Sequence, residues 1–81
     1  MRLDLVLKES RLIKRRTVAK ELCLSGRILV NNKEAKPSFE VKENDIITVK
    51  IGQKNISVKI TYKLIGKRLI PSYEEIGNVN A

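Results

Sequence analysis

Residues 11–30 read RLIKRRTVAKELCLSGRILV, and this stretch organises the predictions for the rest of the chain. Its first ten residues contain five cations and no carboxylate: Arg11, Lys14, Arg15, Arg16 and Lys20. An apolar stripe at helical spacing follows, made of Val18, Ala19, Leu22 and Cys23. The pattern predicts a basic edge mounted on a helix that packs into a core.

Both ends of this helix carry capping signals. Thr17 is a favourable N-cap because its hydroxyl accepts a hydrogen bond from a free backbone N–H of the first turn. Gly26 is a favourable C′ residue because glycine adopts the left-handed conformation without steric cost. The β-branched content of residues 27–30 then predicts a strand. Free N–H groups and the positive end of the helix dipole add to the neighbouring cations, which favours phosphate binding at the helix start.

The charge balance predicts a polyanionic partner. The 81 residues hold 17 Lys and Arg against 9 Asp and Glu, a net charge of +8. Residues 1–36 hold 10 basic and 4 acidic side chains (+6), and residues 37–81 hold 7 and 5 (+2). We therefore expect the polyanion to meet the N-terminal half.

Few residues are suited to catalysis. The chain has no histidine, so a His general base and a His metal ligand are both excluded. Asp45, beside Asn44, is interpreted as a turn residue rather than a base, and Gly26 as a helix cap rather than part of a phosphate loop. We expect a binding protein, not an enzyme, with no cofactor and no metal.

The expected location is the cytoplasm. Cys23 is the single cysteine and has no partner for a disulfide or metal site, which fits a reducing compartment. The longest apolar run falls far short of the roughly 20 residues of a membrane span. No membrane contact is therefore expected.

The fold class predicted is α+β, with two short N-terminal helices packed on a small antiparallel sheet. Residues 2–9 predict the first helix, and its inward face is formed by Leu3, Val6 and Leu7. Leu12 or Ile13 would anchor the linker between the helices in the core.

Strands and turns follow the second helix. Alternating apolar residues predict strands over residues 47–51 and 56–60. Turns are expected at residues 31–33, 43–45 and 52–55. Phe39 and Val41 are expected to fill the core beyond Pro37.

The pattern weakens towards the C-terminus. Gly66, Pro71 and Gly77 interrupt it, and the chain ends in polar residues. We expect one folded domain over residues 1–64 and a loosely held tail over residues 65–81.

The lysines outside residues 11–20 are interpreted as solvated surface. The basic cluster differs, because five like charges repel one another unless a polyanion neutralises them. No aromatic residue lies among these cations, which favours a folded or duplex nucleic acid read through its backbone over base stacking. Composition alone leaves RNA and DNA both open, and Arg2 has a second possible role as partner of Asp4.

Over residues 1 to about 60 the chain resembles the S-four-type RNA-binding domain family, also called the alpha-L motif. The matching stretches are RLD at residues 2–4, SR at 10–11, RTVA at 16–19, SGRILVN at 25–31, Pro37, and VKENDII at 41–47. The chain departs from the family at Asn32 and Asn44, where glycine is usual. Asparagine tolerates positive φ, so the turns should be kept.

This resemblance implies a role on the ribosome. Within the family the chain is most similar to the ribosome-associated heat-shock protein fifteen group, especially its members in ribosome quality control. Such proteins bind large-subunit rRNA and peptidyl-tRNA on stalled, split ribosomes and support a partner that adds template-free alanine tails. By the resemblance, rRNA phosphates would be bound by Arg2, Lys14, Arg15 and Arg16. Asp4 would orient Arg2 or accept a hydrogen bond from a base.

The resulting prediction is a non-enzymatic RNA-binding factor of ribosome quality control that is a monomer off the ribosome. Its RNA-binding residues are expected to be Arg2, Asp4, Arg11, Lys14, Arg15, Arg16, Thr17, Lys20 and Arg27. A stand-alone factor of ribosome assembly is the alternative. An RNA-modifying enzyme is a more distant one, because it would need a further, catalytic domain.

Overall fold

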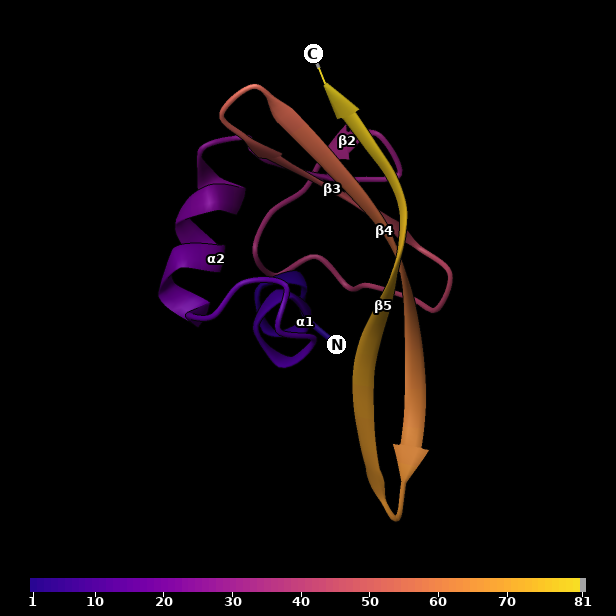
Figure 1. Ribbon diagram of the computed structural model, residues 1–81. Helices are drawn as coiled ribbons and strands as arrows, with labels where there is room; N and C mark the ends of the chain where they lie inside the picture. The colour runs from indigo at the N-terminus through magenta and orange to yellow at the C-terminus, as the bar shows by residue number, and fades with distance from the viewer. Residues whose placement is uncertain (81) are drawn as a thin grey trace.

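The computed structural model describes residues 1–80, with side chains as far as Gly77. Within this range the helices and strands are α1 (Leu3–Glu9), α2 (Arg16–Leu24), β1 (Ile28–Val30), β2 (Lys33–Glu34), β3 (Ile46–Ile51), β4 (Lys54–Ile65) and β5 (Arg68–Asn80) (Figure 1). The strands form one antiparallel sheet in the order β2-β1-β3-β4-β5. The predicted α+β architecture, two N-terminal helices with an antiparallel sheet, is confirmed. No helix of the described residues is long and apolar enough to cross a membrane.

The core lies between the two helices and the sheet. Its largest fully buried side chains are Leu3, Val6, Leu7, Ile28, Ile47, Val49, Val58 and Ile60. Ile13 is also buried, which confirms the expected anchor of the linker between the helices. Two core expectations were wrong: Val18 and Phe39 are 42% and 41% exposed. The helix α2 buries only a narrow face, at Ala19 and Cys23, and Val18 lies outside it.

The segment around Phe39 serves α1 through its backbone rather than its ring. The N–H groups of Leu3 and Asp4 donate to the carbonyls of Phe39 and Pro37, at 2.8 and 3.1 Å. Two free N–H groups of the first turn of α1 are thereby satisfied by main chain, and Arg2 forms a β-bridge with Glu40. Residues 37–40 therefore fix the start of α1.

The helix α2 begins two residues earlier than expected. Arg15 occupies the N-cap position in extended conformation, and no side chain caps the helix, so the expected N-cap role of Thr17 was wrong. The C-terminal end agrees with expectation. Gly26 has φ 76°, its N–H donates to the carbonyl of Cys23 at 3.1 Å, and the N–H of Arg27 donates to that of Leu22 at 3.0 Å. This is a Schellman motif, with Gly26 at C′.

Asparagine serves the turns where the family usually has glycine. Asn31 and Asn32 have φ of 52° and 69° and form a two-residue hairpin turn between β1 and β2. Asn44 has φ 74°. The carboxylate of Asp45 accepts from the N–H of Lys42 at 2.9 Å and from Nδ2 of Asn31 at 3.1 Å, so Asp45 holds two turns together.

The C-terminal region differs from the expected loosely held tail. β4 continues to Ile65, and β5 pairs with it from Ile65↔Arg68 to Lys54↔Asn80. Gly66, at φ 63°, helps to close the turn, and Pro71 lies on an edge strand, where a missing N–H is tolerated. The last residue of the expected tail, Ala81, lies outside the described residues.

Candidate nucleic-acid interface

The centre of the basic surface is a buried carboxylate shared by two arginines. Asp4 is 2% exposed. Its Oδ1 lies 3.2 Å from Nε of Arg2, and its Oδ2 lies 3.3 Å from Nη2 of Arg2 and 3.5 Å from Nε of Arg16. Arg2 precedes α1 and Arg16 opens α2, so this carboxylate joins the starts of the two helices.

The arginines keep Asp4 ionised. Burial acts to raise the pKa of the Asp4 carboxyl, but the hydrogen bond from Arg2 and the charges of Arg16 and Arg2 outweigh it, and the pKa lies below its ordinary value of 3.8. The side chains of Arg2 and Arg16 are 49% and 48% exposed. Each guanidinium is thus held at one edge and open to solvent at another.

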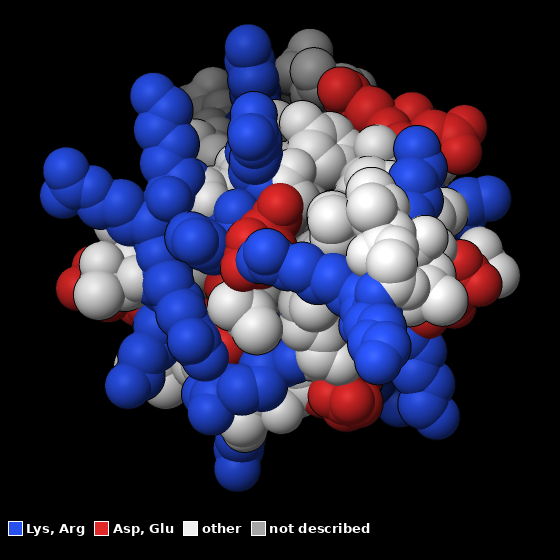
Figure 2. All heavy atoms as spheres, turned by 90° about the horizontal axis from the view of Figure 1, so that it is seen from below, with Lys and Arg blue, Asp and Glu red and all other residues white. Residues whose placement is uncertain are grey.

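The other cations of the cluster lie on the α1–α2 linker and on α2. Exposed positions there are occupied by Arg11, Lys14, Arg15, Thr17 and Lys20. Figure 2 views the molecule from the end where the β4–β5 turn lies, and Lys and Arg side chains cover much of this face. Carboxylates appear there only in small separate groups. Positive side chains thus dominate this face of the molecule.

A hollow of about 420 Å³ adds a residue that the sequence analysis missed. It is lined by Lys8, Glu9, Arg11 and Lys14. Lys8 lies in the last turn of α1, one turn before the linker cations. Helical spacing already placed Lys8 off the apolar face of residues 2–9. Together with its nearness in sequence to Arg11, this could have identified Lys8 as part of the basic site.

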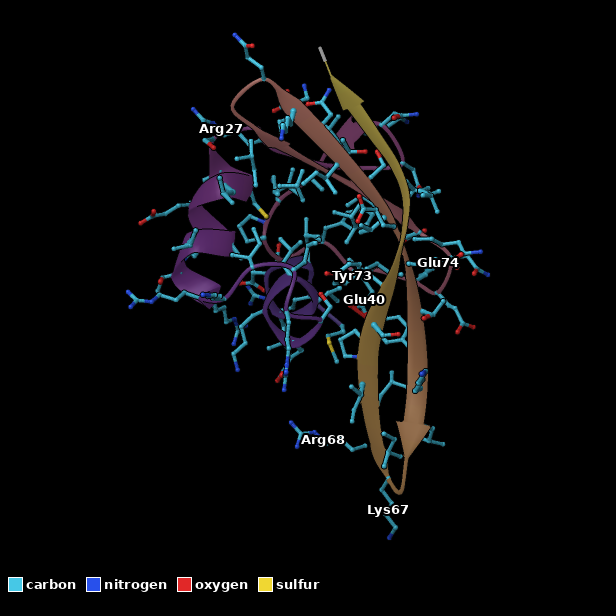
Figure 3. The ribbon with its side chains drawn as sticks, viewed as in Figure 1. Arg27, Glu40, Lys67, Arg68, Tyr73 and Glu74 are labelled. Atoms are coloured by element: carbon cyan, nitrogen blue, oxygen red, sulfur yellow. The ribbon has the colours of Figure 1, made fainter. Side chains whose placement is uncertain are left out.

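Arg27 is separated from the rest of the predicted site. It follows the C-terminal end of α2 (Figure 3), whereas that helix begins with Arg15 at the N-cap and Arg16 in the first turn. Nine helical residues correspond to about 13 Å at 1.5 Å per residue. Arg27 would therefore contact a different part of any ligand than Arg16 does.

The arrangement suits a phosphate backbone. A guanidinium donates through parallel N–H groups and matches two phosphate oxygens at once. Asp4 fixes two such groups before a ligand arrives, and the surrounding lysines add unfixed positive charge. Cys23 offers no reactive group beside them, since burial raises the pKa of its thiol to about 11.

Comparison with known proteins gives consistent results. Residues 1–47 match the family model of the S4 domain. The RQC P-site tRNA stabilizing factor of Halalkalibacterium halodurans is 57% identical over 61 residues, covering 75% of this chain and 69% of that protein. The factor of the same name in Bacillus subtilis is 55% identical over 60 residues, covering 74% and 70%.

A solved structure resembles the fold as well. It is the trimeric structure of heat shock protein 15 from Vibrio cholerae, with a TM-score of 0.72 and 26% sequence identity. The match covers 91% of this chain and 81% of that one.

Proposed function

Because the chain belongs to the S4 domain family, we propose that it is a non-enzymatic RNA-binding factor that acts on ribosomes, with residues 1–64 as its RNA-binding unit. The observation that carries this proposal is the Asp4 carboxylate held between Arg2 and Arg16. A buried charge is costly unless it is paired, and here the pairing leaves both arginines half-exposed. A stabilising core pair would bury its cations, so the arrangement is better suited to holding two guanidinium groups for a ligand.

The RNA contacts are assigned to the whole basic surface. The contact residues are Arg2, Arg11, Lys14, Arg15, Arg16, Thr17 and Lys20, with Asp4 positioning the two arginines and Arg27 reaching a separate phosphate. RNA is favoured over DNA because the relatives are named for tRNA.

The finer function follows the relatives that are named RQC P-site tRNA stabilizing factor. This chain then binds large-subunit rRNA and peptidyl-tRNA on stalled, split ribosomes in the cytoplasm. In that role it supports a partner that adds template-free alanine tails to the nascent chain. Off the ribosome it is a monomer, which differs from the trimeric heat shock protein 15 structure.

Recovery of the tagged protein from its own cells tests this function. RNA sequencing and mass spectrometry of the recovered particles should find large ribosomal subunits carrying tRNA and a nascent chain. Precursor particles with incomplete protein content would favour the alternative, a factor of ribosome assembly. Recovery without ribosomal RNA would refute both.

Salt dependence supplies a second test on purified components. A surface that neutralises about 4 to 5 phosphates should show log affinity falling against log salt with a slope of roughly −3 to −4.5. This slope can be measured by filter binding to purified large subunits at about 50 to 300 mM KCl. A slope near zero would indicate a protein contact instead.

A further inference from the structure

The β4–β5 hairpin extends beyond the rest of the sheet as an arm. The last residue of β4 that pairs with β3 is Lys59, whereas pairing with β5 continues to Ile65↔Arg68. Tyr62 still packs on the body, because its hydroxyl donates to the carbonyl of Val41 at 2.7 Å. Beyond it, residues 63–70 form a two-stranded ribbon that projects from the sheet (Figure 1). We call these residues the arm.

The arm carries its own basic cluster. Lys63, Lys67 and Arg68 are exposed there, and residues 61–73 contain no Asp or Glu. Lys67 points away from the end of the arm, and Arg68 points towards the helices (Figure 3). The Arg68 guanidinium lies 3.9 Å from the carboxylate of Glu9, at the end of α1.

Apolar side chains accompany these cations. Leu64, Ile65 and Leu69 are 70%, 61% and 46% exposed. The cross-strand pairs of the arm, Lys63↔Ile70, Leu64↔Leu69 and Ile65↔Arg68, include no pair of opposite charge. A two-stranded ribbon is marginally stable by itself, and this one leaves most of its apolar surface in water. The presence of these exposed apolar side chains is explained more readily by something that the arm contacts.

A groove connects the arm to the basic surface of the helices. One hollow of about 500 Å³ lies between α1 and the start of β5, and it adjoins the hollow of about 420 Å³ described above through Glu9 and Arg11. The cations along the two hollows are Lys8, Arg11, Lys14 and Arg68, against one carboxylate, that of Glu9. The apolar side of the groove is formed by Leu5, Leu69, Ile70 and Pro71.

Arg11 lines this groove with its backbone in a strained, left-handed conformation. Its φ is 67°, and its N–H donates to the carbonyl of Lys8 at 3.0 Å, which places it at the C′ position after α1. Gly26 fills the equivalent position after α2. A left-handed residue with a β-carbon is strained, and strain of this kind concentrates at functional sites. A long cationic side chain at this strained position is consistent with a ligand in the groove.

We propose that the arm is a second RNA contact, in which the groove between α1 and β5 holds a sugar–phosphate backbone and the end of the arm enters an adjacent RNA groove. This inference rests on the proposed function, and it is continuous with that site because Arg11 and Lys14 belong to both. The charge favours RNA over a protein partner, since the arm and groove offer cations with a single carboxylate. Two-stranded ribbons and apolar wedges both occur in nucleic-acid grooves.

Matched charge removal tests the proposal. One triple variant of the full chain replaces the arm cations with alanine: Lys63→Ala, Lys67→Ala and Arg68→Ala. The control removes the same charge at the opposite end of the sheet, near β2 and the β3–β4 turn (Figure 1): Lys33→Ala, Lys50→Ala and Lys54→Ala. Filter binding to purified large ribosomal subunits and to tRNA is measured over a range of KCl.

The arm variant should bind at least one of these probes more weakly, and its salt slope should be less steep by about 2 to 2.7, at 0.7 to 0.9 per lost contact. The control should change the slope by less than about 1. Equal losses in both variants overturn the proposal, because only net charge would then matter. A wild-type chain that binds neither probe overturns the proposed function itself, and the arm contact with it.

A tethered probe locates the contact independently of affinity. Lys67→Cys places a reactive thiol at the end of the arm, while Cys23 stays unreactive because it is buried and its pKa is raised to about 11. An iron chelate attached there should cleave nearby rRNA or tRNA in the bound particle. Binding without RNA cleavage overturns the proposal. Loss of ribosome binding on Leu64→Ser and Leu69→Ser, with no effect of the charge variant, would reassign the arm to a protein contact and also overturn it.

Discussion

Replacing Asp4 with Asn should weaken RNA binding although it raises the net charge. The chain carries +8, so the variant carries +9, and simple attraction to phosphate would tighten binding. Asp4 instead positions Arg2 and Arg16, with contacts of 3.2 to 3.5 Å. Without the carboxylate both side chains must be ordered when RNA binds, at about 0.5 to 1.5 kcal/mol each. The expected loss of 1 to 3 kcal/mol is about 5- to 150-fold in Kd.

The same variant should be less stable at neutral pH. The variant loses the charged hydrogen bonds of a carboxylate that is 2% exposed and paired to two cations. The half-exposed arginines regain part of this free energy by hydration. We expect a loss of about 1 to 2 kcal/mol, which lowers Tm by about 4 to 16 °C at 4 to 8 °C per kcal/mol. The Asp4 pKa is lowered from 3.8, so its stabilisation is complete above that value and disappears as pH falls through the folded-state pKa.

Two measurements check these expectations. Filter binding to large ribosomal subunits compares Asp4→Asn with Glu21→Gln, an exposed position on α2 that makes the same change in charge. Denaturant unfolding at pH 7 and near pH 3 follows the stability difference, which should shrink at the lower pH. Tighter binding by Asp4→Asn, or a stability difference that is unchanged between the two pH values, would refute the positioning role of the carboxylate.

Three further predictions concern other parts of the chain. Arg16→Ala should weaken ribosome binding more than Lys54→Ala in gradient co-sedimentation, because only Arg16 is held at the helix start; equal losses would argue against a localised surface. Gly26→Val should lower Tm by several degrees in circular dichroism, since φ is 76° and a β-carbon would also approach Oε1 of Glu34 at 2.7 Å; melting like the parent would contradict this. Cys23 should react with a thiol reagent at pH 8 only after denaturation, because its pKa is about 11, and fast labelling of the native chain would count against the burial.

Local signals were sufficient for much of the fold. The left-handed Gly26 and the positive-φ asparagines Asn32 and Asn44 were predictable because few residue types tolerate those conformations. The buried face of α1, the strand β3 and residues 56–60 of β4 followed from period alone. The pairing of Arg2 with Asp4 was foreseen as one of two roles, and the structure adds Arg16 as a second partner.

The misses arose where tertiary contacts override local preference. Thr17 is a good cap in isolation, but the helix already begins at Arg16, which makes an ion pair with Asp4 of α1. Phe39 has an apolar side chain typical of a core, yet that side chain is exposed, and its carbonyl accepts a hydrogen bond from the first turn of α1. Gly66 and Pro71 read as chain breakers, whereas the hairpin uses the first in its turn and accommodates the second on the edge strand β5.

The shared carboxylate also ties ligand binding to the internal motions of the domain. Arg2 and Arg16 belong to the starts of different helices, so any separation of α1 from α2 must break at least one of the two ion pairs. Guanidinium groups that are already in place strengthen RNA binding. Because this coupling is reciprocal, bound RNA in turn stabilises the closed arrangement of α1 and α2. Amide hydrogen exchange in α2 should therefore slow in the complex even at residues that touch no nucleotide.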